Sequence, residues 1–162
     1  MALWLLGWLT ASAQVLDPGA ATEARHLAIM GGWSAANLVG GTTGYVLADD
    51  PQWRNFHGTN AAWNVVNGAI VAAGALGLNR RRDGFETPEA LAKHQRGLQT
   101  SLAINIGLDV AYVGTGAALM ALGASNERDD LRGMGQSLIL QGGFLLVFDS
   151  AFLASLRAKT RG

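Results

Sequence analysis

The sequence predicts an all-α membrane protein, an antiparallel bundle of four transmembrane helices preceded by a short hydrophobic segment. Three observations predict this fold class. Only 15% of the 162 residues are charged and 49% are hydrophobic, whereas about 25% charged residues is usual in a soluble domain. Four apolar segments are each long enough to cross a hydrocarbon core of about 30 Å at about 1.5 Å per residue. Glycine is abundant, with 22 residues, and glycine lets membrane helices approach closely.

The predicted spans cover residues 26–48, 57–78, 101–123 and 134–156. The third span, SLAINIGLDVAYVGTGAALMALG, is almost wholly apolar and contains one acid, Asp109. Thr87 is predicted to cap the helix that leads into this span, with Pro88 at its first position, where a missing N–H costs nothing. The spans form a single domain, residues 26–157, which a basic tail of residues 158–162 follows.

The N-terminal residues 1–13, MALWLLGWLTASA, are apolar but too short to span a membrane. The tripeptide ASA at their end matches a signal-peptidase site, whereas the usual basic n-region is missing. The segment is therefore either signal-like or a short interfacial helix anchored by Trp4 and Trp8. Residues 14–25 contain the turn signal DPG and are predicted to be a loop.

Basic residues gather at one end of the predicted bundle. With four spans, the start of the first helix, the loop before the third span and the C-terminus share one side, which carries nine of the 12 Lys and Arg residues. The positive-inside rule places this side in the cytoplasm, as in a bacterial inner-membrane protein. A cleaved signal peptide would place it outside. The charge count decides for the cytoplasm because it sums many residues, whereas the signal prediction depends on one tripeptide.

Small residues form a stripe along the first span. Gly32, Ala36, Gly40 and Gly44 recur at every fourth position and so lie along one slowly drifting face. Small residues at this spacing allow two helix backbones to come close together. The stripe therefore predicts a packing face for another helix.

Polar residues inside the spans are candidates for a site. Asp109 and Asp149 each lie roughly 10–12 Å below the basic surface, on antiparallel helices, so the two acids can share one layer. Asn37 and Asn67 fall somewhat deeper, and Asn105 falls somewhat shallower. These side chains could hold a proton, a cation or a small polar ligand. Alternatively they only fasten the helices together through interhelical hydrogen bonds.

The composition excludes several classes of function. Without cysteine there is no disulfide, no thiolate metal site and no cysteine nucleophile. Acidic and basic residues are equal in number, at 12 each, and no basic patch with interleaved aromatic residues points to nucleic acid. None of the three histidines lies deep in a span. No catalytic residue, metal site, haem or other cofactor is therefore predicted.

Four segments together resemble a family of small bacterial integral membrane proteins of unknown function. They are GGWSAANLVGGTTG, FHGTNAAWNVVNGAIVAAG, NIGLDVAYVGTGAAL and RGMGQSLILQGGFLLVFD. The resemblance covers about residues 26–156 and depends on the order of the Gly-, Asn- and Asp-bearing spans. It implies a signal-like segment at the N-terminus, and it implies no activity and no site residue.

These observations predict a non-enzymatic integral membrane protein that acts as an interaction or assembly subunit. Its expected partners are the lipid bilayer and either a membrane protein or a second copy of the chain. The reason is that packing chemistry occurs throughout the spans and no catalytic constellation occurs. The alternative is a small transporter, channel component or ligand-binding membrane protein that uses Asp109 and Asp149.

Overall fold

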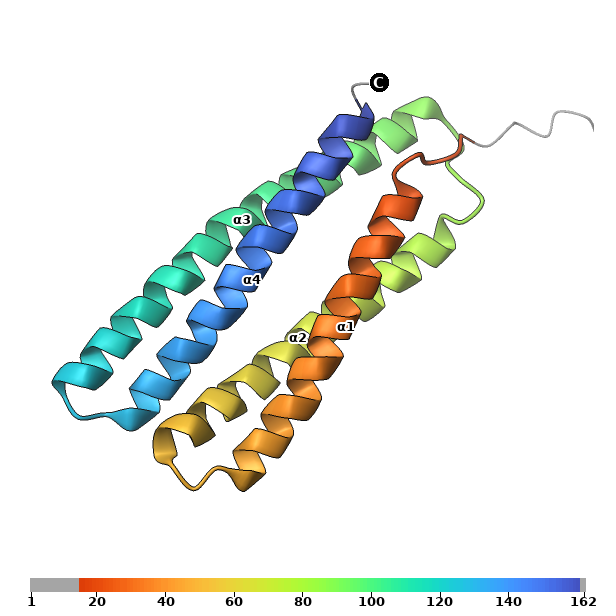
Figure 1. The fold of residues 1–162 in the computed structure, drawn as a ribbon. Helices are drawn as coiled ribbons and strands as arrows, with labels where there is room; N and C mark the ends of the chain where they lie inside the picture. Colours follow the sequence, from red (N-terminus) through yellow and green to blue (C-terminus); the bar gives the residue numbers. More distant parts are fainter. Residues whose placement is uncertain (1–14, 161–162) are drawn as a thin grey trace, which may run out of the picture.

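The computed structural model describes residues 15–160 and contains four long helices (Figure 1). They are α1 (Ala20–Leu47), α2 (Pro51–Arg80), α3 (Pro88–Ser125) and α4 (Asp129–Thr160). Within the described range there is no strand, and Val15 and Phe85 form only an isolated β-bridge. The predicted all-α fold is therefore confirmed. The predicted signal-like or interfacial segment, residues 1–13, lies outside the described residues.

The first helix starts inside the segment predicted to be a loop. The DPG sequence does form a turn, in which the Asp17 carboxylate accepts a hydrogen bond from the Gly19 N–H (2.8 Å). The helix then begins immediately, at Ala20. Alanine is the best helix former, and the sequence AATEA after the turn explains why α1 begins six residues before the predicted span.

The starts of α2 and α3 follow the same local chemistry. Asp50 caps α2 by accepting a hydrogen bond from the Trp53 N–H (3.0 Å). Thr87 caps α3 by accepting one from the Ala90 N–H (3.2 Å), which confirms the predicted cap. In both helices a proline follows the cap, and at the first helical position its missing N–H leaves no helical bond unmade.

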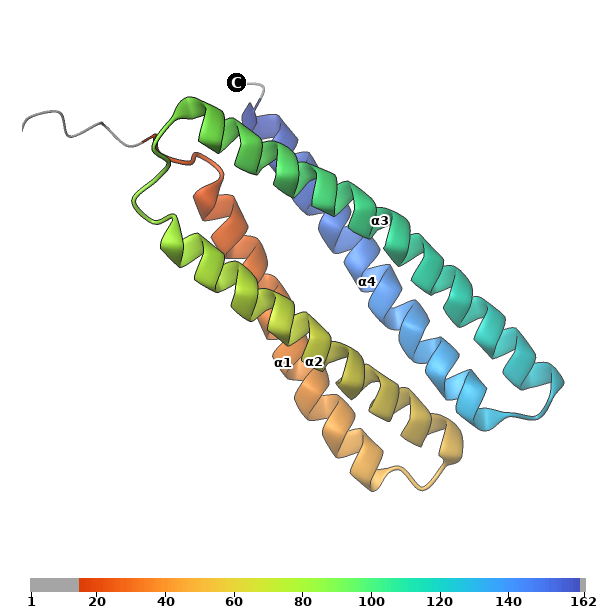
Figure 2. The ribbon, with the colours of Figure 1, turned by 180° about the vertical axis from the view of Figure 1, so that it is seen from behind.

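The helices are arranged as two hairpins that lie side by side (Figures 1 and 2). One hairpin consists of α1 and α2, and the other of α3 and α4. The hairpins meet mainly where α2 packs on α4, with a smaller contact between α1 and α4. Among the four helices, the backbone of α3 is adjacent only to that of α4. An apolar cluster of Leu102, Phe152, Leu153 and Leu156 fills the α3–α4 interface near the end of α4.

Glycine allows α4 to pack closely against both of its main neighbours. A Cβ atom added at Gly133 would clash with the backbone carbonyl oxygen of Gln52 on α2. A Cβ atom at Gly135 would lie 2.5 Å from the carbonyl oxygen of Gly116 on α3, and one at Gly116 would lie 2.7 Å from that of Gly135. The backbones therefore touch at these crossings, as close packing through small residues allows in membrane helices.

The glycine-containing stripe predicted on α1 is only partly used within the chain. Gly44 packs beneath the ring of His57 on α2, whereas Gly32 and Gly40 have no neighbouring atom within 4 Å of an added Cβ. The closest backbone approach is at Gly41, where a Cβ would lie 2.9 Å from the His57 carbonyl oxygen. The exposed members of the stripe are Gly32, Ala36 and Gly40. In a helix of 3.6 residues per turn, each step of four residues rotates the side-chain direction by about 40°. Over the four residues of the stripe the direction therefore rotates by about 120°, and the stripe leaves the interface.

Three of the four helices, α2, α3 and α4, are long and apolar enough to cross a membrane. Large apolar side chains remain exposed on each of them, such as Ile70, Ile104 and Val147. Faces of this kind suit contact with acyl chains rather than water. The helix α1 is not among these three, so its use as a fourth span stays a prediction.

We expect Gly133→Ala to lower the free energy of unfolding by roughly 1–3 kcal/mol, the usual effect of overpacking. The added methyl group would force α2 and α4 apart at Gln52. Thermal unfolding in detergent measures the change. Gly143→Ala on the same helix is the matched control, because a Cβ at Gly143 has no neighbour within 4 Å. Equal melting temperatures for the two variants would contradict the proposed contact.

Candidate functional site: a cleft between the hairpins

A cleft of about 530 Å³ lies between the two hairpins, and all four helices contribute to its wall. It occupies the half of the bundle that contains the start of α1 and the end of α4, which we call the basic end. Most of its lining is apolar or aromatic, and its polar walls include the sequence candidates Asn67, Asn105, Asp109 and Asp149. Ligand pockets usually measure about 300–1,000 Å³ and combine an apolar lining with a few polar groups. The cleft fits this description.

The cleft opens between α2 and α3, whose backbones are not adjacent. Val66 and Ile70 on α2 and Leu108 on α3 line the cleft and are also exposed at its opening. Further along, the rings of Trp63 on α2 and Tyr112 on α3 meet edge to face, with centroids 4.7 Å apart. The opening therefore has an apolar rim, and an aromatic pair bridges the gap between the hairpins.

The two candidate acids lie in the same cleft. Asp109 on α3 is 3% exposed and Asp149 on α4 is 7% exposed. They are close enough to interact electrostatically. Asn105 and His26 lie near Asp149 in the wall of the cleft, so an amide and an imidazole border the same carboxyl group. Oδ2 of Asp109 has no hydrogen-bond partner among the described residues.

Aromatic rings form a second wall of the cleft. The imidazole of His26 on α1 stacks on Phe152 of α4, with centroids 3.9 Å apart and planes 14° from parallel. Phe148 lies beside it, at 5.4 Å. Aromatic faces carry partial negative charge and attract cations. Together with the two carboxyl groups, they make the cleft suitable for a group that is cationic or donates hydrogen bonds.

Beside the cleft, away from the basic end, an amide network of Trp33, Asn37, Asn60 and Gln141 joins three helices. Gln141 on α4 is completely buried. Its side-chain oxygen accepts a hydrogen bond from Trp33 Nε1 on α1 (3.0 Å), and its nitrogen donates to the Asn60 side-chain oxygen on α2. Asn60 in turn donates to Asn37 Oδ1 on α1 (2.8 Å). Asn37, predicted to belong with the two acids, therefore lies in the amide network instead.

The asparagines of α2 connect this network to the cleft. Asn64 Nδ2 donates to the Asn60 backbone carbonyl (2.8 Å), and Asn67 Nδ2 donates to Asn64 Oδ1 (3.3 Å). All three side chains are buried. Asn67 is both the last member of this row and part of the cleft wall. Of the five sequence candidates, four therefore line the cleft and one does not.

Several cleft residues were not singled out by the sequence analysis as site residues. His26, Trp63 and Tyr112 line the cleft, and no motif surrounds them in the sequence. One signal was present. Trp63 precedes Asn67 by four residues and Tyr112 follows Asp109 by three, and residues at these spacings share a helix face.

Comparison with known families gives one match. The model of DUF6992, a family of unknown function, matches residues 29–150, more than half of the chain. No curated protein matches, and no solved structure matches. The predicted resemblance to a family of unknown function is confirmed, whereas a bacterial source and a membrane location stay predictions.

We expect Gln141→Leu to lower the free energy of unfolding by roughly 1–3 kcal/mol, because it leaves buried groups of Trp33 and Asn60 unpaired. A double-mutant cycle with Asn60→Leu, measured by thermal unfolding in detergent, should give a coupling of about 0.6–2 kcal/mol. The exposed Asn79 supplies the control, since Asn79→Leu should be additive with Gln141→Leu. If the effects of Gln141→Leu and Asn60→Leu on stability were also additive, the result would count against the hydrogen-bonded network.

Proposed function

The chain belongs to DUF6992, and we propose that it is an integral membrane protein that binds a small amphiphilic molecule in the cleft between its hairpins. The ligand carries one cationic or hydrogen-bond-donating group. The observation that carries the proposal is that two buried aspartates, on different helices, line one cleft of about 530 Å³. This geometry favours a ligand-binding protein over the interaction or assembly subunit that was expected first.

The polar wall supports the class of the ligand group. A buried carboxyl oxygen without a partner, such as Asp109 Oδ2, is costly. A bound ammonium or hydroxyl group would supply the missing donor. Phe148 and Phe152 beside the acids add aromatic faces to the same region of the cleft, and such faces favour a cation over a neutral donor.

The size of the cleft favours a small molecule over a partner helix. One turn of a helix, with a diameter of about 10 Å and a pitch of about 5.4 Å, fills roughly 400 Å³. A spanning partner needs about 20 residues, or between five and six turns. The cleft, at about 530 Å³, would hold little more than one turn of such a helix. A short amphiphile fits better.

The apolar rim supports entry from the bilayer. Val66, Ile70 and Leu108 are exposed at the opening, and in a membrane-embedded bundle such residues face acyl chains. The apolarity and length of α2, α3 and α4 support the membrane location. The excess of Lys and Arg at the basic end supports a cytoplasmic position for that end, in the inner membrane of a bacterium.

Binding is tested with octylamine as the probe, and with octanol and octanoate as probes of equal chain length. At about tenfold excess over Kd, a ligand of the folded state stabilises it by about 1.4 kcal/mol. We therefore expect octylamine to raise the melting temperature in detergent by a few degrees, and octanoate to leave it unchanged. The shift should disappear in the Asp109→Asn/Asp149→Asn double variant.

Asp83→Asn is the matched control, because it removes a carboxylate from the exposed loop between α2 and α3. Each shift is referred to the same variant without probe, so that a change in intrinsic stability does not enter. Equal shifts with octanoate and octylamine, or a full octylamine shift in the double variant, would contradict the proposal. Recovery of a cross-linked dimer in place of a probe effect would favour the assembly subunit.

Membrane location and orientation are tested by cysteine labelling, because the natural chain contains no cysteine. We expect Asn126→Cys, in the α3–α4 loop, to react with an impermeant maleimide on intact bacterial cells. Arg82→Cys, in the α2–α3 loop, should react only after permeabilisation. Both positions are exposed. The reverse pattern would overturn the orientation, and recovery of the protein in the soluble fraction would overturn the membrane location.

A further inference from the structure

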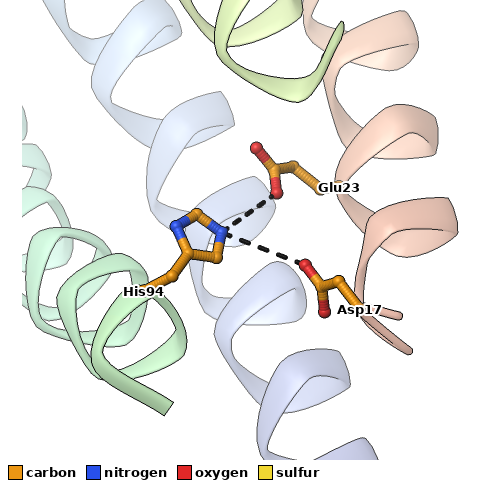
Figure 3. A group of neighbouring side chains, drawn as sticks. All are labelled: Asp17, Glu23 and His94. Carbon is orange, nitrogen blue, oxygen red and sulfur yellow. Dashed lines mark ion pairs between the residues drawn. The ribbon is translucent and has the colours of Figure 1, made fainter. Parts of the chain in front are cut away.

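A second group of side chains lies at the basic end of the bundle, outside the two-aspartate wall of the cleft. It consists of Asp17, Glu23 and His94 (Figure 3). Asp17 belongs to the segment before α1, Glu23 to the first turn of α1, and His94 to the second turn of α3. The bridge between Val15 and Phe85 holds the segment before α1 against the loop before α3. Residues far apart in the sequence are thereby brought together.

The separations between these groups are too long for direct hydrogen bonds. His94 Nε2 lies 3.5 Å from Glu23 Oε2 and 4.0 Å from Asp17 Oδ2, whereas a charge-assisted N–H···O bond measures about 2.7–2.9 Å. Two ligands of one tetrahedral ion, each bonded at about 2.0–2.1 Å, lie about 3.3–3.4 Å apart. The Glu23 separation nearly matches this value, and that of Asp17 exceeds it by roughly half an ångström.

Each carboxylate is held by its other oxygen. Glu23 Oε1 accepts a hydrogen bond from Arg81 Nη2 (2.7 Å). Asp17 Oδ1 accepts one from the Gly19 N–H (2.8 Å) and a longer one from Gln95 Nε2 (3.5 Å). These bonds direct Glu23 Oε2 and Asp17 Oδ2 toward the imidazole. Outer hydrogen bonds that orient ligating carboxylates in this way are typical of metal sites.

The inward-facing atoms are buried. The side chain of Asp17 is 7% exposed, that of Glu23 10% and that of His94 21%. In the described part of the chain, Glu23 Oε2 and His94 Nε2 have no hydrogen-bond partner. A cavity of about 10 Å³ lies among the three residues, which is about the space that one water molecule or ion needs.

The charges of the surrounding groups do not fully offset those of the two carboxylates, which favours a bound cation. Arg81 offsets one of the two carboxylate charges. Lys159 also lines the cavity, but it is exposed and its Nζ lies 3.5 Å from the Pro18 carbonyl oxygen rather than beside a carboxylate. Apart from the imidazole of His94, the described residues therefore supply no buried counter-charge to the second carboxylate.

We propose that Asp17, Glu23 and His94 bind one divalent transition-metal ion, with a fourth position open to water. One imidazole nitrogen and two carboxylate oxygens suit Zn²⁺ and its neighbours in the first transition row better than Ca²⁺ or Mg²⁺. The sequence predicted no metal site, since no short motif joins these residues. Glu23 also lines the cleft, so the proposed metal site borders the candidate ligand site.

The test is calorimetric titration of Zn²⁺ into the full chain in detergent, after removal of metal with EDTA. We expect one ion per chain. His94→Gln and Glu23→Gln should each weaken binding by roughly a hundredfold or more, because loss of a ligand exceeds the 10–100-fold effect of an outer partner. Glu89→Gln at the exposed start of α3 and His57→Gln at the opposite end are the matched controls and should bind Zn²⁺ as the natural chain does.

A rescue variant separates a metal site from an ion pair, even if the loss of His94 weakens the fold. His94→Cys retains a zinc ligand but removes the imidazole. With Co²⁺ it should restore binding and produce a thiolate-to-cobalt absorption band, in a chain with no other cysteine. Absence of Zn²⁺ binding by the natural chain, or unchanged binding by His94→Gln, would overturn the proposal. Either result would leave the cluster as an ion pair that fastens α1 to α3, and neither bears on octylamine binding in the cleft.

Discussion

The fold depends on the buried amide of Gln141, which joins α1 and α2 to α4 through Trp33 and Asn60. Apolar contacts between membrane helices are not directional and differ little from contacts with lipid, so they do not select one arrangement of two hairpins. Hydrogen bonds between buried amides do, because each unmet donor or acceptor in a dry interior costs about 1–3 kcal/mol. The amide network therefore sets how far each hairpin is displaced along the other.

The network and the glycine crossings divide the bundle into two halves of different character. In one half, Gly133 and Gly135 bring α4 into backbone contact with both of its main neighbours. In the other half, larger side chains such as Phe148 and Phe152 keep the hairpins apart, and the cleft results. The dense half fixes the relative positions of the helices, and the open half contains the cleft and the unpaired polar atoms. The candidate site and the proposed metal site both lie in the open half.

The amount of structure that could be predicted from the sequence differed with the range of the interactions. The all-α fold and the cap at Thr87 depend on local pattern, and both are present. The start of α1 at Ala20 also has a local cause, but the DPG turn concealed it. The stripe on α1 was harder to interpret, because spacing identifies a face without identifying the neighbour. Gly41, between two members of the stripe, makes the closest approach to α2.

The candidate site shows the same dependence. Depth along antiparallel helices was enough to place Asp109 and Asp149 in one layer, and both line the cleft. Asn37 has a similar depth but faces Asn60, since depth does not determine rotation about the helix axis. The cluster of Asp17, Glu23 and His94 could not be predicted, because it depends on how the segment before α1 folds back onto α3.

The Asn37–Asn60 hydrogen bond has a further consequence, because the helices leave the ribosome one after another. Both residues belong to the first hairpin, and Gln141 is synthesised 81 residues after Asn60. In the proposed membrane location, the early hairpin would enter the bilayer during that interval, before its later partner. The hydrogen bond of 2.8 Å between Asn37 and Asn60 pairs two of the side-chain amides within that hairpin. The hairpin alone would therefore not present fully unpaired amides to the lipid. Biogenesis can then proceed hairpin by hairpin, with α4 completing the assembly.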